Sequence, residues 1–368
     1  MEQNKRFFDV STHKTEKVYS FFQKINNTYP DFFEGERRVA RTRWHGKISQ
    51  KSYSFVEDIK NVFYPDGKGF KEEKYQEAIG GSGDEATKNK ILHSSSLCAF
   101  LFFSGIDEEH PLTIDGISYT EVYFEYKNQV ISPHYGPSNI DVLLVHRDEQ
   151  NHSNCLLFLE SKFSEYYLET GQAEVSPAYC GDKIDVTSGA IMSRGKEKDY
   201  YHELGLELDG LACSGLILCS NHGKAFRPTH KNPHDKPSFC YHLKTEGGRS
   251  RYCTGIKQMI CHYIGLNNFA NGHYWHEQTD QSKQKIQEIK NPELRLGQIA
   301  FRFEGSEDAF VSLETDYKFL AGNLGKLKTA NQDIILLNHV LTYQNIWANN
   351  PKYHESLNEI IRRFYALM

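Results

Sequence analysis

Two apolar runs decide how this chain folds, Ser138-Asn-Ile-Asp-Val-Leu-Leu-Val-His146 and Cys155-Leu-Leu-Phe-Leu-Glu-Ser-Lys162. Each run has the length of a β-strand, and the polar residues 147–154 between them are typical of a turn. Residues 117–130 come before them and alternate regularly between two faces, as a strand does. Together, the three segments predict an antiparallel meander.

Weaker signals surround this meander. Gly80-Gly-Ser-Gly83 breaks the chain, and we expect a helix after it that ends at Gly105. Residues 1–79 indicate mixed helices and loops. Further elements are expected toward the C-terminus: a helix at 254–268, a strand at 298–304, a strand or helix from 332, and an amphipathic helix from Tyr353.

Composition limits the class of protein. The chain has 368 residues, of which 39% are hydrophobic and 25% charged, so we expect a folded chain. It contains no run of eighteen apolar residues, so no membrane span is expected. The start lacks the apolar core of a secretory signal, which predicts a cytoplasmic location. The eight cysteines stand singly, which favours reduced thiols.

Chemically reactive side chains lie at the ends of the two apolar runs. Glu160 and Lys162 are two residues apart and therefore share one face of a strand. A hairpin brings Asp141, at the start of the partner strand, beside them. Burying two carboxylates and an ammonium is costly, unless a divalent cation balances the charge. An ordinary reading is a surface ion pair, but Glu160 directly follows five apolar-type residues, 155–159, which favours a metal site.

The net charge is −5, so any contact with nucleic acid must come from local basic segments. Residues 33–52 hold six basic side chains against two acidic ones, and Arg37, Arg38, Arg41 and Arg43 lie among them. Residues 221–252 hold seven against two, and include Lys224, Arg227 and Lys231. We expect these arginines and lysines to contact DNA phosphates. Plain solvated surface is the alternative for each segment.

A meander whose second strand carries Ile140-Asp141 and whose third ends in Glu160-Ser-Lys162 resembles the PD-(D/E)XK nuclease core. The proline of the signature is displaced, since Pro137 lies four residues before Asp141. More specifically, the chain resembles a family of restriction endonucleases within that superfamily. Four blocks carry this likeness: 91–103, 138–144, 158–165 and Leu341-Thr-Tyr-Gln-Asn-Ile346.

The resemblance implies a function for individual residues. Asp141 and Glu160 would bind Mg²⁺, for which Mn²⁺ can substitute, with the Ser161 carbonyl as a third ligand. Lys162 would be catalytic. Glu85 would be the acidic residue that many members take from the first core helix, and its alternative is a carboxylate favoured by the helix dipole. Glu165 and Gln258 are further candidates near the site.

The resemblance also implies a fold and partners. The fold class is α/β, a restriction-endonuclease-like core of αβββαβ order with a mixed sheet flanked by helices. We expect an N-terminal helical or loop extension at 1–79, the core at 80–310 with a basic insertion at about 221–252, and a C-terminal extension at 311–368 packed on the core. The expected activity is Mg²⁺-dependent hydrolysis of phosphodiester bonds in double-stranded DNA. A restriction role implies a cognate methyltransferase, and cutting both strands favours a homodimer.

Other interpretations stay open. The same core serves in nucleases for DNA repair, DNA junctions or RNA, and a protein of this fold can bind nucleic acid without cutting it. Zinc could bind among the cysteines from 213 to 261 with His242 and His262, although their spacing fits no common ligand pattern. His230-Lys-Asn-Pro-His234 lacks the strands and helix of a His-Asn-His nuclease, and Gly80–Gly83 lacks the Gly-Lys-Ser/Thr ending of a phosphate-binding loop.

Overall fold

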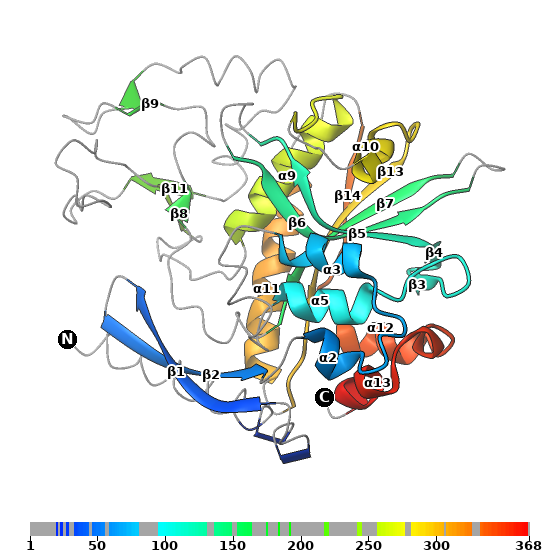
Figure 1. Ribbon diagram of the computed structural model, residues 1–368. Coiled ribbons are helices and arrows are strands. Elements are labelled where there is room, and N and C mark those ends of the chain that lie inside the picture. The colour runs from blue at the N-terminus through cyan, green and yellow to red at the C-terminus, as the bar shows by residue number, and fades with distance from the viewer. Residues whose placement is uncertain are drawn as a thin grey trace.

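A mixed β-sheet runs through the computed structural model, and helices lie on both of its faces (Figure 1). The structure describes 20, 23–24, 27–28, 33–43, 46–55, 59–80, 95–130, 136–148, 153–163, 174–175, 183–184, 191–192, 217–220, 241–244, 256–276, 281–304, 307–325 and 332–366. For 33–55 and 174–244, it describes the backbone alone.

Six strands form this sheet in the order β14-β13-β7-β6-β5, with β15 paired to the end of β13. They are β5 (Glu121–Asn128), β6 (Ser138–His146), β7 (Cys155–Lys162), β13 (Glu293–Ala300), β14 (Ile334–Leu336) and β15 (Leu341–Thr342). β5, β6 and β7 pair antiparallel, which confirms the predicted meander. β13 runs parallel to β7, β14 and β15, so the sheet is mixed and the fold class is α/β.

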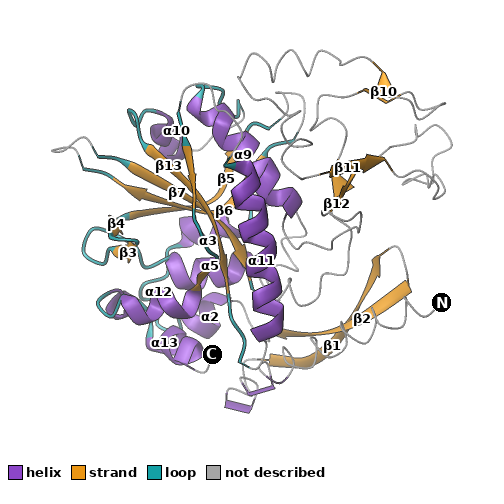
Figure 2. Cartoon of the chain, turned by 180° about the vertical axis from the view of Figure 1, so that it is seen from behind, coloured by secondary structure: helices purple, strands orange, loops and turns teal. Residues whose placement is uncertain are grey.

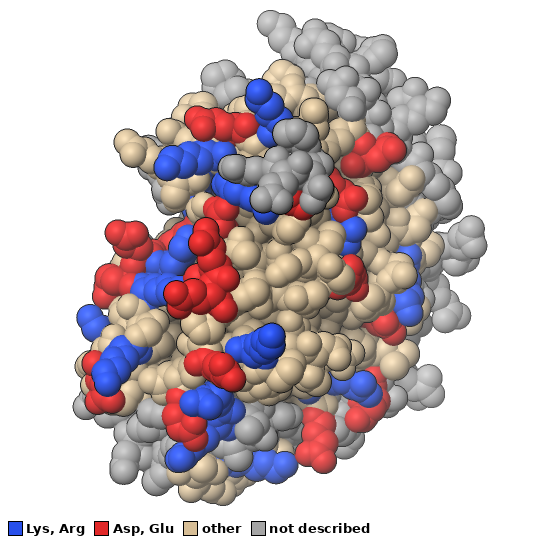
Figure 3. Space-filling view, turned by 90° about the vertical axis from the view of Figure 1, so that its right-hand side faces the viewer, with Lys and Arg blue, Asp and Glu red and all other residues tan. Residues whose placement is uncertain are grey.

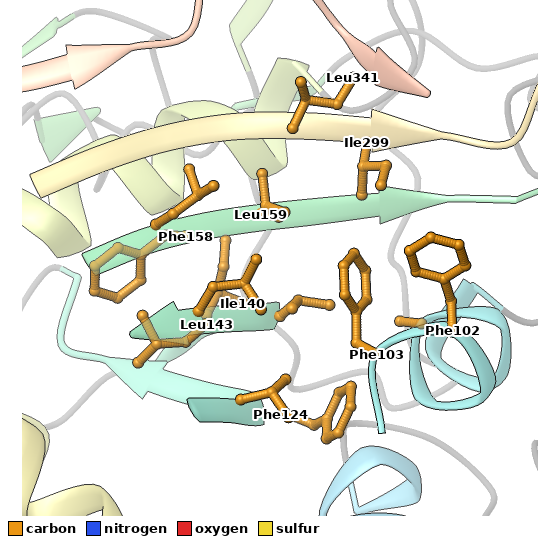
Figure 4. Packing of buried hydrophobic residues seen from close by; sticks show 14 of the residues in the cluster. Phe102, Phe103, Phe124, Ile140, Leu143, Phe158, Leu159, Ile299 and Leu341 are labelled. Carbon is orange, nitrogen blue, oxygen red and sulfur yellow. The ribbon is translucent and has the colours of Figure 1, made fainter. Parts of the chain in front are cut away.

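The centre of the sheet is covered on both faces. All eight residues of β7 are buried, which explains why its first five, 155–159, form a continuous apolar run and do not alternate. Phe102 and Phe103 point toward the sheet, in the part of the core that also holds Ile140 and Leu159 (Figure 4). Burial of each large apolar side chain contributes about 1.5–3 kcal/mol to the free energy of folding.

Two layers of helices enclose the sheet (Figure 2). On one face lies α9 (Ile256–Ala270), which contacts β5, β6, β13 and β14 and has α11 (Glu307–Leu324) beside it. On the other lies α5 (Ser95–Phe103), which contacts β6 and β7. Residues 97–103 are all buried, as expected for a helix that is apolar all round. α5 ends at Phe103, close to the end predicted at Gly105.

The N-terminal region differs from its prediction. β1 (Phe33–Arg43) and β2 (Gly46–Phe55) form an antiparallel hairpin where helices and loops were expected. In the sequence, charged residues occur at both odd and even positions of β1, and polar residues at both odd and even positions of β2, so no apolar alternation reveals the hairpin. α2 (Ile59–Phe63) and α3 (Glu72–Ile79) bury Phe63 and Tyr75 in the main core, so residues 59–79 pack with the core itself.

The C-terminal region also joins the core. α11 begins at Glu307 and crosses the expected boundary at 310/311, and β14 and β15 belong to the main sheet. The strand expected at 298–304 begins five residues earlier, because the apolar run that pairs with β7 starts near Leu294. The chain continues through α12 (Tyr343–Asn349), the 3₁₀ turn η3 (Tyr353–Ser356) and α13 (Glu359–Ala366).

The remaining elements are short. β3 (Leu112–Ile114) and β4 (Ile117–Tyr119) form a hairpin whose turn residues, Asp115 and Gly116, both have positive φ, as a type I′ turn requires. The others are α10 (Gln281–Gln287), β8 (Glu174–Val175), β9 (Lys183–Ile184), β10 (Ile191–Met192), β11 (Ile217–Ser220) and β12 (Tyr241–Lys244). Among the described residues, no helix has the length and apolarity to cross a bilayer.

Candidate active site

The end of β7 sends alternate side chains to opposite helix layers. Glu160 and Lys162 form an ion pair, with 3.0 Å between Glu160 Oε1 and Lys162 Nζ, and both side chains are almost fully buried. Both also contact α9. Ser161 lies between them in the chain, and its hydroxyl donates to the carbonyl of Ser95 on α5 and lies 2.8 Å from the Tyr343 hydroxyl on α12. The two-residue period of a strand is the cause of this separation.

Asp141 lies next to this strand end, as its spacing predicts. The pair Val142–Leu159 in the β6–β7 ladder makes Asp141 and Glu160 the next facing positions. The backbone N–H of Ser161 donates to Asp141 Oδ2 at 2.7 Å. The structure thus brings together Asp141, Glu160 and Lys162.

Helix α9 supplies two further polar side chains. Gln258 and His262 are four residues apart and therefore lie on the same side of this helix. Lys162 Nζ donates to Gln258 Oε1 at 2.7 Å, and His262 Nε2 lies 2.8 Å from Glu160 Oε2. Gln258 is exposed and His262 is buried. Sequence reasoning named Gln258 as a candidate but gave His262 no place in this site.

The two carboxylates have opposite electrostatic environments. Burial by itself would raise the pKa of Glu160, but the charge of Lys162 and the hydrogen bond with His262 outweigh burial and lower this pKa to about 2. Burial raises the pKa of Asp141 well above its ordinary value, and the nearby charges of Glu160 and Glu125 raise it further. Lys162 and the Ser161 N–H oppose this rise only in part. The site thus concentrates negative charge around Asp141.

Glu125 on β5 is a third carboxylate near Asp141 that sequence reasoning missed. The pairs Phe124–Val142 and Tyr126–Ile140 on either side of it place Glu125 opposite Asp141. Glu125 is buried, and Ser96 on α5 donates to its Oε1 at 3.2 Å. The antiparallel register could have revealed this neighbour, because it pairs positions on β5 and β6 one by one.

The backbone at Glu125 is strained and is held by a buried lysine. Its φ is 48°, a conformation that costs a residue with a side chain about 1–2 kcal/mol. Lys283 of α10 donates to the carbonyls of Phe124 and Glu125 and forms an ion pair with Glu77 at 2.9 Å. Strained backbone of this kind occurs often at functional sites, where the surrounding structure holds it in place.

Gln298 extends the row of polar residues across the sheet. The parallel register places it beside Glu160, on β13. Its side chain is buried, and within the described part of the chain its Nε2 has no hydrogen-bond partner. Before the register was known, no signal marked this glutamine, because β13 also contains Glu293 and Arg295 and a further polar residue does not stand out.

Several predicted residues cannot be placed in this site. Glu85, Glu165, Lys224, Arg227 and Lys231 lie outside the described residues. Arg37, Arg38, Arg41 and Arg43 belong to β1, where they face Ser52, Lys51, Ile48 and Gly46 across the hairpin. On the face shown in Figure 3, the described lysines and arginines lie among aspartates and glutamates. That face therefore offers no continuous basic surface of its own.

The donors at this site fit a hard divalent cation. Mg²⁺ keeps several waters and takes one or two carboxylates from the protein, a number that Asp141 and Glu160 supply. The raised pKa of Asp141 shows that its ionised form lacks a sufficient counter-charge, which a bound cation would provide. Among the described residues, no group of three or more His, Cys, Asp and Glu side chains has the geometry of a metal cage. Of the zinc site considered from sequence, Cys213, Cys240 and Cys253 lie outside the described residues, and His262 contacts Glu160.

Models of protein families, curated proteins and solved structures give no match to this chain. The functional assignment therefore rests on the chemistry and geometry of its own residues.

Proposed function

We propose that this protein is a Mg²⁺-dependent endonuclease with a restriction-endonuclease-like core, and that it hydrolyses phosphodiester bonds in double-stranded DNA. The observation that carries the proposal is the cluster of Asp141, Glu160 and Lys162 where β6 and β7 meet. In this cluster, the Ser161 N–H binds Asp141 and Lys162 forms a buried ion pair with Glu160. Burying these charges costs free energy, and binding of a cation and a phosphate at the site would offset that cost.

The order of elements supports the same core. Leaving aside the β3–β4 hairpin, the short strands β8–β12 and helix α10, the chain runs α5, β5, β6, β7, α9 and β13, which is the αβββαβ order expected from the resemblance. β13 returns parallel to β7, and α9 lies between them in the chain. The carboxylates lie on the central strands of this unit, while Gln258 and His262 come from its second helix.

Each side chain has a distinct chemical part in the proposed reaction. Asp141 and Glu160 would hold the cation. A cation bound there polarises the scissile phosphate and lowers the pKa of a coordinated water. Lys162 would orient the attacking water and offset the negative charge that develops on the phosphate. Gln258, which accepts from Lys162 at the exposed side of the site, would fix the direction of that ammonium group.

The substrate and partners belong to the same proposal. The basic residues of 33–52 and 221–252 would contact DNA phosphates, a second copy of the chain would cut the other strand, and a methyltransferase would protect the host DNA. A preference for RNA, branched DNA or methylated DNA would change the substrate but not the chemistry of the site.

Cleavage of unmethylated plasmid and phage DNA in Mg²⁺ tests the proposal, with EDTA and Asp141→Ala as controls. We expect discrete fragments that disappear in both controls. Asp107→Asn is a matched variant, because Asp107 is a partly exposed carboxylate paired with Lys71 away from the sheet centre, and it should cut normally. Absence of cleavage with every divalent metal and every nucleic-acid substrate would refute a nuclease function.

A further inference from the structure

His262 contacts the site from a different part of the chain. It lies on α9, 102 residues from Glu160 in sequence, and its Nε2 is 2.8 Å from Glu160 Oε2. Both side chains are almost completely buried, with exposed fractions of 3% for His262 and 2% for Glu160. At this depth it cannot be a direct contact for bulk solvent or for a polymer that binds at the surface. Its contact with Glu160 is therefore its most direct route to the chemistry.

The geometry fixes which ring nitrogen carries the hydrogen. A carboxylate accepts hydrogen bonds, so Nε2 must donate to Glu160 Oε2. The other ring nitrogen, Nδ1, is buried and has no hydrogen-bond partner among the described residues. A bare acceptor at Nδ1 is less costly there than an unpaired N–H donor. The ring is thus set to direct one N–H at one oxygen of Glu160.

The two oxygens of Glu160 are held by two different elements. Lys162, on the same strand, lies 3.0 Å from Oε1, and His262, on α9, holds Oε2. Each carboxylate oxygen has a second lone pair that remains available to a cation. Without His262, the carboxylate would have a buried oxygen without its donor and could rotate away from the cation. Loss of such a supporting hydrogen bond typically weakens metal binding by about 10–100-fold.

We propose that His262 is a positioning residue, whose Nε2–H holds the Glu160 carboxylate in the orientation that binds a divalent cation. This inference rests on the proposed metal-dependent function. His262 touches neither DNA nor the reacting atoms in this scheme, and it acts only through Glu160. The hydrogen bond, and not the aromatic ring or a positive charge, is the feature that matters.

Calorimetric titration of the full-length protein with MnCl₂, without DNA, tests this inference by metal affinity. His262→Gln and His262→Met form a matched pair, because their side chains have similar length and only glutamine can donate. We expect His262→Met to bind Mn²⁺ about 10–100-fold more weakly than the wild type. His262→Gln should restore affinity close to wild type. If the methionine variant does not fold, His262→Asn replaces it, because its shorter side chain does not reach Glu160.

Ile264→Ala controls for loss of stability. Ile264 is a buried residue on the same helix, so this variant should have a lower Tm and unchanged Mn²⁺ affinity. Wild-type affinity in His262→Met, or equal losses in the methionine and glutamine variants, would overturn the positioning role and leave the proposed function intact. If the wild type itself binds no Mn²⁺, and Asp141→Asn behaves identically, both the inference and the metal-dependent function are wrong.

Discussion

Asp141 and Glu160 belong to one cluster of carboxylates, but their neighbours differ. Glu160 has a lysine and a histidine as direct partners, and its pKa falls to about 2. Burial raises the pKa of Asp141, and two nearby carboxylates raise it further, while among the described residues its carboxylate accepts one backbone N–H. Pairs of titratable groups whose pKa values are driven apart are typical of catalytic sites.

Asp141→Asn should stabilise the metal-free protein while abolishing cleavage. The raised pKa means that the unfolded state ionises first as the pH rises, so ionisation of Asp141 lowers stability above its unfolded pKa of about 3.9. Asparagine removes this cost and still offers an oxygen to the Ser161 N–H. We expect a higher Tm at neutral pH, with the difference disappearing in acid, where aspartate is protonated in both states.

Thermal unfolding in EDTA across a pH series measures this effect. For chains of 150–250 residues, a change of 1 kcal/mol in the free energy of unfolding shifts Tm by about 2–4 °C. Addition of Mg²⁺ should raise the Tm of the wild type and not that of Asp141→Asn. A lower Tm for the variant in EDTA at neutral pH would mean that Asp141 is not held in an unfavourable ionised state.

Lys162→Ala should remove cleavage and largely preserve DNA binding. The lysine is buried against Glu160 and Gln258 and would act on the reacting water and phosphate, so we expect a loss of at least about 100-fold in rate. A cleavage assay with a parallel gel-shift titration gives both quantities. Lys71→Ala, which removes a partly exposed lysine paired with Asp107, is the control. Retained cutting by Lys162→Ala would exclude this lysine from the mechanism.

Close packing of helix α9 on the sheet sets the geometry of the site. Gly265 lies one turn after His262 and faces the end of the β5–β6 pair. A Cβ atom there would come within 2.8 Å of Asn128 Cβ and 2.9 Å of Ser138 Oγ. Asn268 then donates to the carbonyls of Gln129 and Val130, which fixes the end of the helix to the end of β5. The positions of Gln258 and His262 depend on this close approach.

Gly265→Ala should therefore lower both stability and activity. Alanine favours a helix over glycine by up to about 1 kcal/mol, but overpacking against the sheet costs about 1–3 kcal/mol. Displacement of α9 would also lengthen the His262–Glu160 contact. Gly322→Ala on α11 is a matched control, because its Cβ would meet no atom within 4 Å. Chemical denaturation and Mn²⁺ titration of both variants test the prediction, and equal stability of the two would contradict it.

At the scale of the whole molecule, the sheet that carries the candidate site and the regions expected to bind DNA are separate parts of the chain. The sheet and its helices provide the carboxylates, while the arginines of β1 lie in a hairpin outside the main sheet (Figure 1). The net charge of −5 gives the protein no general attraction for DNA. Under the proposed function, DNA binding would therefore depend on local basic segments.

Replacing Arg37 and Arg38 by alanine should weaken binding to every DNA sequence and reduce its salt dependence. Each lost phosphate contact lowers the slope of log K against log salt by about 0.9. Binding titrations at several salt concentrations measure this slope, with Arg362→Ala on the C-terminal helix α13 as a control for loss of surface charge. An unchanged slope would assign the β1 arginines to ordinary surface.

The sequence by itself determined the meander, the spacing of Asp141, Glu160 and Lys162, and the two helices of the core. These features depend on local periodicity and on neighbours a few residues away. It did not reveal the β1–β2 hairpin, where polar or charged residues on both faces hide the strand pattern.

Only the tertiary structure placed Glu125 opposite Asp141, Gln298 beside Glu160, and His262 against Glu160. These contacts depend on strand register and on how α9 packs on the sheet, and they join residues up to 138 positions apart. A sequence pattern of period two or 3.6 carries no information at that range. Burial then converts these contacts into shifted pKa values, because a charge removed from water responds strongly to its few remaining neighbours.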